Sequence, residues 1–268
     1  MLADARGFAF DLDGTLVQRG ANGPEPLPRA REVLDAVRAS GRPLVVFTNA
    51  SHATPATLAE RVSAGGLPLA EQEVLTPICS AIGELRHRHA GRSVYAFATP
   101  ATRERLLASG VELLADADAV RAEVVLVAHA DDAPLATMEA AARAVRAGAR
   151  LLTANYAPAY AGADGPIISR GAMITAAIAR AAQTRPLVVG KPSHAALRAL
   201  VARLALPARE LVIVGDDLGM DVALGRLGGA RTILVRSGIS GDDEVARAPA
   251  GRRPDRVVDE VGALLELP

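Results

Sequence analysis

The stretch Phe8-Ala9-Phe10-Asp11-Leu12-Asp13-Gly14-Thr15 contains the pattern on which the fold prediction rests. A short apolar run ends abruptly in two carboxylates, Asp11 and Asp13, and Gly14 then allows the chain to turn. Taken alone, the segment also fits an ordinary connection from a strand to a turn, because Asp, Gly and Thr are common in turns. Its meaning therefore depends on whether other apolar runs end in the same way.

Three further apolar runs also end in polar residues. They are Leu44-Val45-Val46-Phe47 before Thr48-Asn49, Leu187-Val188-Val189 before Gly190-Lys191-Pro192, and Leu211-Val212-Ile213-Val214 before Gly215-Asp216-Asp217. Continuous runs of this length suit strands that are buried on both faces of a parallel sheet. Helical spacing of apolar residues over 29–39 and 195–204 supplies crossover helices between such strands. We predict a doubly wound α/β core with a parallel sheet, in which the polar segments meet at the carboxyl ends of the strands.

The middle of the chain has its own alternation of strands and helices. Residues 93–98, 124–129 and 150–153 are predicted strands, and 101–108 and 134–147 are predicted helices. None of these strands ends in an acidic pair or in Gly-Lys. We therefore predict a core domain formed by residues 1–80 and 185–268, with a smaller α/β domain inserted at 81–184.

Composition narrows the partners and the compartment. Lys plus Arg and Asp plus Glu both number 30 in 268 residues, so no net charge draws the molecule to nucleic acid or to an anionic membrane. The apolar runs are far shorter than the roughly 20 residues of a membrane-spanning helix. Cys79 has no second cysteine with which to form a disulfide, and the first residues lack a signal-peptide pattern, so we expect a cytoplasmic protein. A homodimer is left open, because no apolar stripe identifies a contact.

The carboxylates predict a metal site. Asp216, Asp217 and Asp221 follow one strand, and Asp11 and Asp13 follow another, so up to five carboxylates would share one crevice. Their mutual repulsion would raise their pKa values unless cations neutralised them. Because all these ligands are oxygens, a hard ion fits best, and Mg²⁺ is the usual choice beside phosphate.

Groups at two other strand ends suit a phosphate dianion. Lys191 supplies a fixed cation, and Thr48 with the backbone amides of Asn49 and Ala50 supplies neutral donors. A carboxylate nucleophile and a phosphoryl group repel each other, so Mg²⁺ and Lys191 would screen both charges. A single lysine or threonine would more often have a surface or capping role. Their occurrence together in this order favours phosphate binding over those roles.

The order of these motifs resembles the haloacid dehalogenase superfamily, particularly its nitrophenylphosphatase-like branch, which includes the NagD-type sugar and nucleotide phosphatases. The segments Phe47-Thr48-Asn49-Ala50-Ser51, Val74-Leu75-Thr76-Pro77 and Gly190-Lys191-Pro192-Ser193 look like that branch, and the insertion has the size and position of its α/β cap. The resemblance implies a Mg²⁺-dependent phosphatase that acts on small phosphomonoesters such as sugar phosphates or nucleotides.

The resemblance also implies roles for single residues. Asp11 would attack phosphorus and become an aspartyl phosphate, and Asp13 would act as general acid and then as general base. Asp11, the backbone carbonyl of Asp13 and Asp216 would bind the metal, with Asp221 supporting it through water. Thr48 and Lys191 would bind phosphate. Asp217 stands where the family varies.

One loop of the insertion departs from the family pattern. Thr153-Ala154-Asn155-Tyr156-Ala157 stands where relatives commonly have Thr-Asn-Pro-Asp, so Asn155 is kept and the two residues after it differ. We expect Asn155 and Tyr156, and with them Tyr160 and Asp164, to face the substrate. An ordinary exposed loop is the alternative.

Other functions fit part of the pattern. The same aspartyl phosphate could pass its phosphoryl group to a sugar hydroxyl, as in a mutase. Dehalogenation is disfavoured because Asp13, which suits protonation of an alkoxide, has no evident use in it. A phosphorylated receiver module is disfavoured by Asp13 and by the insertion of about a hundred residues. A catalytically inactive binding protein would lack a core position, and none is missing.

Overall fold

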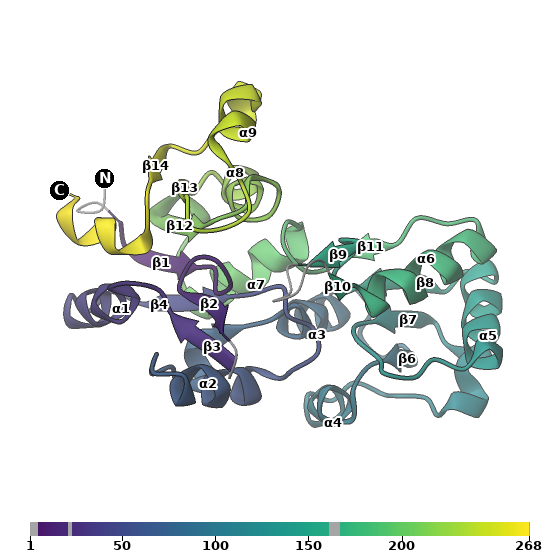
Figure 1. Cartoon of the computed structure of the whole chain (residues 1–268). Helices are drawn as coiled ribbons and strands as arrows, with labels where there is room; N and C mark the ends of the chain where they lie inside the picture. The colour runs from purple at the N-terminus through teal and green to yellow at the C-terminus, as the bar shows by residue number, and fades with distance from the viewer. Residues whose placement is uncertain (1–4, 21–22, 161–166, 268) are drawn as a thin grey trace. The chain divides into compact units, whose positions relative to one another are not determined.

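The structure is a computed structural model that describes residues 5–20, 23–160 and 167–267. The chain forms two compact units (Figure 1). The first unit is assembled from three separate segments, Met1–Thr48, Pro55–Leu75 and Lys191–Pro268. The second unit contains Asn49–Thr54 and Thr76–Gly190, and we call it the inserted unit.

A six-stranded parallel sheet forms the centre of the first unit, in the order β14-β13-β12-β1-β4-β5. Its strands are β1 (Gly7–Phe10), β4 (Leu44–Phe47), β5 (Val74–Leu75), β12 (Leu211–Gly215), β13 (Arg231–Val235) and β14 (Arg256–Val258). Every residue of β1, β4 and β12 is buried, as expected for central strands covered on both faces. The chain leaves β1 for β4 on one side and returns to β12 on the other, so the strand order reverses at β1. The predicted doubly wound core is confirmed.

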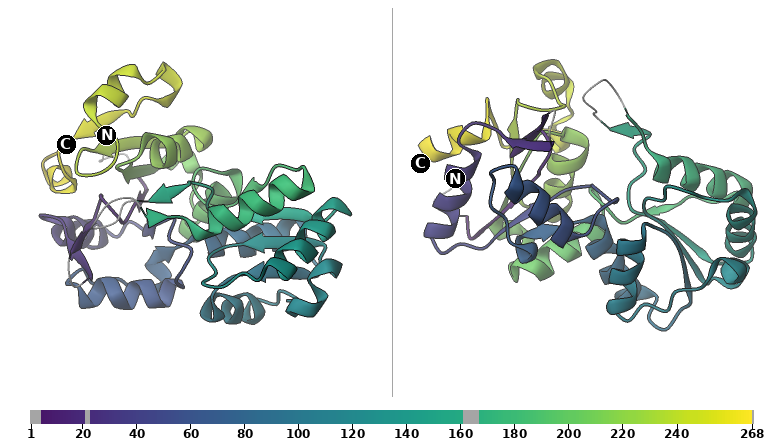
Figure 2. Two further views of the ribbon diagram at one scale, coloured as in Figure 1. Left: turned by 45° about the vertical axis from the view of Figure 1, so that its right-hand side comes forward. Right: turned by 60° about the horizontal axis from the view of Figure 1, so that its bottom comes forward.

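Helices cover both faces of this sheet (Figures 1 and 2). On one face α1 packs against the C-terminal turn Val261–Glu266, and on the other α7 packs against α8. The helices of this unit are α1 (Ala30–Ala39), α2 (Pro55–Ala64), α7 (His194–Leu204), α8 (Ala223–Gly228) and α9 (Asp242–Arg247), and an antiparallel hairpin adds β2 (Val17–Gly20) and β3 (Gly23–Pro26). Apolar residues at helical spacing, Val33, Leu34 and Val37, form the buried face of α1.

The inserted unit has a four-stranded parallel sheet in the order β11-β8-β7-β6. Its elements are α3 (Pro77–Arg88), β6 (Val94–Phe97), α4 (Pro100–Ala108), β7 (Val124–Val127), α5 (Leu135–Arg146), β8 (Arg150–Thr153), β9 (Ala159–Tyr160), β10 (Ile167–Ile168), α6 (Arg170–Ala182) and β11 (Leu187–Val188). Its core joins Val125 and Val127 of β7 to Val145 of α5 and Ile178 of α6. The strands that the sequence predicted over 93–98, 124–129 and 150–153 correspond to β6, β7 and β8.

One predicted core strand lies elsewhere. The run Leu187-Val188-Val189 was expected in the central sheet, but β11 pairs with β8 of the inserted unit. The amides of Val189 and Gly190 continue this pairing, because they donate to the carbonyls of Thr153 and Ala154. Leu187 is 49% exposed, as suits a short edge strand rather than a central one. The inserted unit includes Asn49–Thr54, and its longer segment covers Thr76–Gly190, whereas the predicted insertion covered 81–184.

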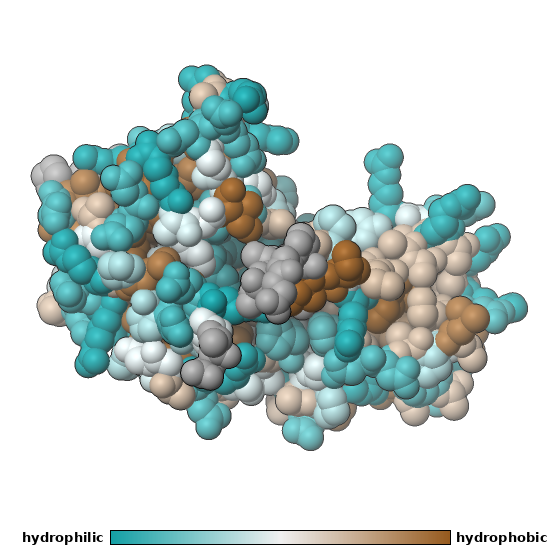
Figure 3. Space-filling model, viewed as in Figure 1, coloured by the Kyte–Doolittle hydropathy of each residue, from teal (hydrophilic) through white to brown (hydrophobic). Residues whose placement is uncertain are grey.

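The surface of the inserted unit carries apolar side chains over α5 and α6. Figure 3 shows tan and brown residues over these helices, and Leu135 of α5 and Met173 of α6 are 80% and 60% exposed.

In the part of the chain that the structure describes, no helix combines the length and the apolar character needed to cross a bilayer.

Candidate active site

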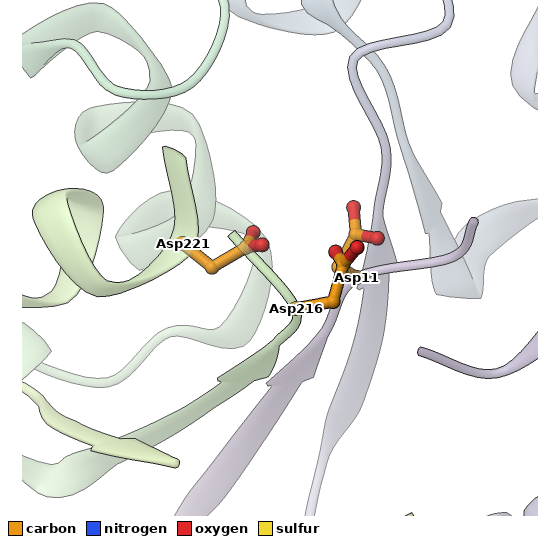
Figure 4. Close-up of side chains that lie close together, drawn as sticks. All are labelled: Asp11, Asp216 and Asp221. Atoms are coloured by element: carbon orange, nitrogen blue, oxygen red, sulfur yellow. The ribbon is translucent and has the colours of Figure 1, made fainter. Parts of the chain in front are cut away.

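The carboxyl ends of two adjacent strands place the first two carboxylates of the site. β1 pairs with β12 so that Phe10 lies opposite Val214, and the residue directly after each strand is an aspartate, Asp11 after β1 and Asp216 after β12. Asp221 comes from the short π-helical turn Leu218–Val222 that follows β12. Figure 4 shows its carboxylate directed toward those of Asp11 and Asp216. One oxygen from each of the three lies within 4.8 Å of the others.

Lys191 joins two of these carboxylates. Its Nζ lies 2.6 Å from Asp11 Oδ1 and 2.7 Å from Asp221 Oδ1, and the side chain is 3% exposed. The ammonium also lies 5.5 Å from the centroid of the Phe47 ring, within range of a cation–π attraction. Because a buried ammonium needs compensating charge, the two carboxylates hold Lys191 in one position.

Asp216 is held by the loop Ser237–Ser240, which follows β13 and which we call the 237–240 loop. The amide of Ile239 donates to Asp216 Oδ2 at 2.8 Å, and the amide of Ser240 donates to the Asp216 carbonyl at 3.0 Å. A Cβ atom on Gly238 would lie 1.8 Å from Asp216 Oδ2, so only glycine allows this approach. Both the side chain and the main chain of Asp216 are therefore fixed.

Asp221 is positioned by the turn that carries it and by a second glycine. The Asp217 carboxylate caps this turn by accepting from the amides of Gly219 and Met220 at 2.6 and 3.1 Å, and the amide of Asp221 donates to the Asp217 carbonyl. A Cβ atom on Gly215 would lie 2.2 Å from Asp221 Cγ. The Asp217 side chain thus has a structural use, and Gly215 provides the space for Asp221.

The electrostatics of the site reflect crowded carboxylates. Burial raises the pKa of Asp216 to about 7, and the charge on Asp11 adds to this effect. Burial likewise raises the pKa of Asp221 to about 8 against the opposing attraction of Lys191. For Lys191 burial disfavours the charge, but Asp11 and Asp221 outweigh it and raise the pKa of the ammonium. Three carboxylates beside one lysine leave an excess of negative charge when all are ionised.

The residues of this cluster fit a hard divalent cation. The donors are carboxylate oxygens from three elements, and one lysine cannot balance three negative charges. Oxygen ligands of this kind are preferred by Mg²⁺ and Ca²⁺ over the softer metals. Asp11, Asp216 and Asp221 are thus the side chains available to hold such an ion.

Comparison with known proteins places this arrangement in a family. A family model described as haloacid dehalogenase-like hydrolase matches residues 8–112, and a second HAD-hydrolase-like model matches residues 188–264. Ribonucleotide monophosphatase NagD of Escherichia coli K12 is 30% identical over 239 residues, which cover 89% of this chain and 90% of NagD. The chain belongs to the haloacid dehalogenase-like hydrolases.

Two solved structures are similar to this hydrolase over nearly its whole length. The p-nitrophenyl phosphatase from Archaeoglobus fulgidus superposes with a TM-score of 0.86 at 27% identity, over 98% of this chain and 99% of that one. Glycerol phosphate phosphatase Rv1692 from Mycobacterium tuberculosis, whose structure is a complex with magnesium, has a TM-score of 0.86 at 27% identity, over 98% of this chain and 77% of its own.

Two further predicted site residues of this haloacid dehalogenase-like hydrolase, Thr48 and Asp13, belong to the first unit. Thr48 is buried and directly follows β4, and its amide donates to the Leu75 carbonyl at 3.2 Å. Asn49 and Ala50 follow it along the chain and belong to the inserted unit. Asp13 faces solvent, and its carboxylate is not part of the three-aspartate group. Although the side chain is open to solvent, the protein atoms crowded around its carboxyl group, followed by the charge on Asp11, raise the pKa of Asp13 to about 6.

The predicted specificity loop lies in the inserted unit. Asn155 Oδ1 accepts a hydrogen bond from the Ala157 amide at 3.0 Å, so this side chain shapes the loop itself. Tyr156 is 40% exposed. Tyr160 is in β9, and Asp164 lies outside the described residues.

Sequence reasoning missed the 237–240 loop and the two glycines. The signal was present, because Ile233-Leu234-Val235 is another apolar run, and polar residues follow it at Arg236 and Ser237. The loop carries no acidic or lysine side chain, so nothing in its composition marked it as part of the site. Gly215 and Gly238 are required because neither has a Cβ atom, and only the structure shows that a Cβ atom there would collide with Asp221 or Asp216.

Proposed function

We propose that this hydrolase is a Mg²⁺-dependent phosphatase that releases phosphate from small phosphomonoesters. The observation that carries the proposal is the buried Asp11 carboxylate at the end of β1, paired with Lys191 and grouped with Asp216 and Asp221. A phosphoryl transition state needs a nucleophile and concentrated positive charge around the equatorial oxygens. A bound Mg²⁺ would supply that charge and would be held by Asp11, Asp216 and the Asp13 carbonyl, with Asp221 supporting it through water.

The protein groups would act in two steps. In the first, an oxygen of Asp11 attacks phosphorus, the bond to the leaving oxygen breaks, and Asp13 donates a proton to that oxygen. In the second, Asp13 removes a proton from water, which attacks the aspartyl phosphate and releases inorganic phosphate while Asp11 is restored. A pKa of about 6 suits both tasks, because a group near neutrality gives and takes protons readily.

Phosphate binding is assigned to the same strand ends. Lys191 brings a fixed positive charge to Asp11 and would neutralise the phosphoryl oxygens as they approach. Thr48 and the backbone amides of Asn49 and Ala50 would donate hydrogen bonds to the remaining oxygens.

The inserted unit would discriminate among leaving groups, with the core as the catalytic domain. Asn155 and Tyr156 are the residues that we assign to this task, and the exposed ring of Tyr156 suits contact with a sugar or a base. NagD and Rv1692 are named for nucleotide and glycerol phosphate substrates, which supports a small phosphorylated metabolite here. We place the enzyme in the cytoplasm and leave a homodimer as a proposal.

Hydrolysis of 4-nitrophenyl phosphate tests the proposal. The wild type should release nitrophenol and inorganic phosphate in equal amounts, should stop with EDTA and should recover with Mg²⁺. Asp11→Asn should lower turnover by about 10³-fold or more, because the amide is a poor nucleophile. Ordinary turnover by Asp11→Asn, or turnover indifferent to EDTA, would contradict the proposal. Nitrophenol released without matching phosphate would instead indicate phosphoryl transfer to another acceptor.

A further inference from the structure

The 237–240 loop contacts both halves of the acidic cluster. Ile239 and Ser240 bind Asp216 through their amides. The Ser240 hydroxyl in addition accepts a hydrogen bond from the Leu218 amide at 3.0 Å. Leu218 is the first residue of the turn that carries Asp221. One serine therefore connects the strand end that bears Asp216 to the turn that bears Asp221.

Ser240 makes these contacts in a dry environment. Its relative exposure is 3%, and that of Leu218 is 5%. A buried amide that loses its acceptor costs more free energy than an exposed one, because water does not replace the lost bond without rearrangement. Loss of the hydroxyl should therefore move the turn rather than leave the Leu218 amide unpaired.

The same loop reaches the nucleophile segment. The Ser237 hydroxyl donates to the Gly14 carbonyl at 2.7 Å, and Gly14 follows Asp13 in the segment that begins with Asp11. Ser237 is exposed, so we expect the loss of its hydrogen bond to displace the loop less than the loss of the buried hydrogen bond of Ser240. Together the two serines tie the loop to all three pieces of chain that bear the predicted ligands.

We infer that the 237–240 loop is a positioning element for the cation site, in which Ser240 sets the place of Asp221 relative to Asp216. Mg²⁺ demands near-ideal placement of its oxygen ligands, so a small displacement of one carboxylate weakens binding. The inference rests on the proposed function in one respect, namely that the three carboxylates bind a divalent cation. Ser240 itself would contact neither the cation nor the substrate.

The test compares Ser240→Ala with Ser80→Ala. Ser80 is also fully buried, but its hydroxyl meets no hydrogen-bond partner among the described residues, and it belongs to the inserted unit. The Mg²⁺ concentration that half-saturates the rise in melting temperature reports binding without any need for turnover. The Mg²⁺ concentration that half-saturates hydrolysis of 4-nitrophenyl phosphate is the second readout.

Ser240→Ala should need about tenfold more Mg²⁺ in both titrations, a change equivalent to about 1.4 kcal/mol. Its kcat at saturating Mg²⁺ should stay within about threefold of the wild type, because added cation restores the occupied site. Ser80→Ala should titrate as the wild type does. Ser237→Ala, whose exposed site leaves folding undisturbed, should shift both titrations in the same direction by about threefold.

Two results would overturn the inference. If Ser240→Ala and Ser237→Ala titrate at the wild-type Mg²⁺ concentration, the loop has no positioning role, even if the metal-free melting temperature falls. If the melting temperature of the wild type itself ignores Mg²⁺, both the metal assignment and the role of the loop are wrong. The first result leaves the proposed phosphatase intact, and the second does not.

Discussion

At the scale of single residues, the site depends on glycines, which have no side chain, as much as on its charged residues. Gly215 leaves room for Asp221, and Gly238 lets the 237–240 loop approach Asp216. Gly14, with a φ of +82°, adopts a left-handed conformation in the segment that follows Asp11. The carboxylates could not converge on one cation if these positions carried a Cβ atom.

Gly215→Ala tests this dependence. The new methyl group would lie 2.2 Å from Asp221 Cγ, so Asp221 must leave its place beside Lys191. We expect a loss of about 1–3 kcal/mol in the free energy of unfolding and a fall of at least about tenfold in 4-nitrophenyl phosphate hydrolysis. Urea unfolding and steady-state kinetics measure the two effects.

Gly83→Ala is the matched control for that substitution. Gly83 lies within α3, and an added Cβ would meet nothing within 4 Å. Alanine favours a helix by up to about 1 kcal/mol over glycine, so this variant should be as stable as the wild type or more stable, with unchanged activity. Equal losses from both substitutions would show that the effect of Gly215→Ala does not arise at Asp221.

At the scale of elements, strand ends explain both what sequence predicted and what it missed. The continuous apolar runs of β1, β4 and β12 identified central strands, and the polar residues that follow β1 and β12 placed Asp11 and Asp216 at one edge of the sheet. The run at β11 has the same composition but pairs in the other sheet. Composition reports that a strand is apolar and does not report which strand it pairs with.

Short and partly exposed strands were beyond sequence reasoning for a different reason. β5 has two residues, and β14 is only partly buried, so neither gives a periodic signal. Lys191 was expected at the end of a core strand, whereas it begins a segment of the core immediately after an edge strand of the inserted unit. Lys191 Nζ contacts Asp11 because the buried ammonium needs a carboxylate partner, and not because the two residues follow paired strands.

The elements that bear the carboxylates also predict how stability depends on pH. In the metal-free protein, burial raises the pKa of Asp216 to about 7 and that of Asp221 to about 8, above the ordinary value of 3.8. The folded state therefore retains protons that the unfolded chain releases. This favourable contribution is complete below about pH 4 and is lost as the pH rises through about 7 to 8.

Urea unfolding of EDTA-treated protein between about pH 5 and about pH 8.5 measures that contribution. We expect the free energy of unfolding to fall with rising pH, and added Mg²⁺ to stabilise the protein more at the upper end, where the carboxylates are ionised. Asp216→Asn keeps an oxygen to accept from the Ile239 amide but does not titrate, so its curve should be flatter. A wild-type curve that is flat or rises across this range would contradict the assignment of buried carboxylates.

At the scale of the whole molecule, one site is assembled from segments that are distant in the chain. Asp11, Lys191 and Asp216 belong to the first unit, yet the inserted unit separates the first of them from the other two in sequence. The cluster therefore requires the completed parallel sheet, and no isolated segment contains it. The family motifs could be recognised from sequence because their order along the chain is kept even though the spacing is large.

The proposed mechanism requires that Asp11 becomes covalently phosphorylated during turnover. Acid quenching of the enzyme while it hydrolyses 4-nitrophenyl phosphate, followed by mass spectrometry of its peptides, locates the phosphoryl group. We predict that it lies on Asp11, that it accumulates further in Asp13→Asn, in which hydrolysis of the intermediate is slowed, and that Asp11→Asn carries none. A phosphoryl group on a different residue, or wild-type turnover by Asp11→Asn, would show that Asp11 is not the nucleophile.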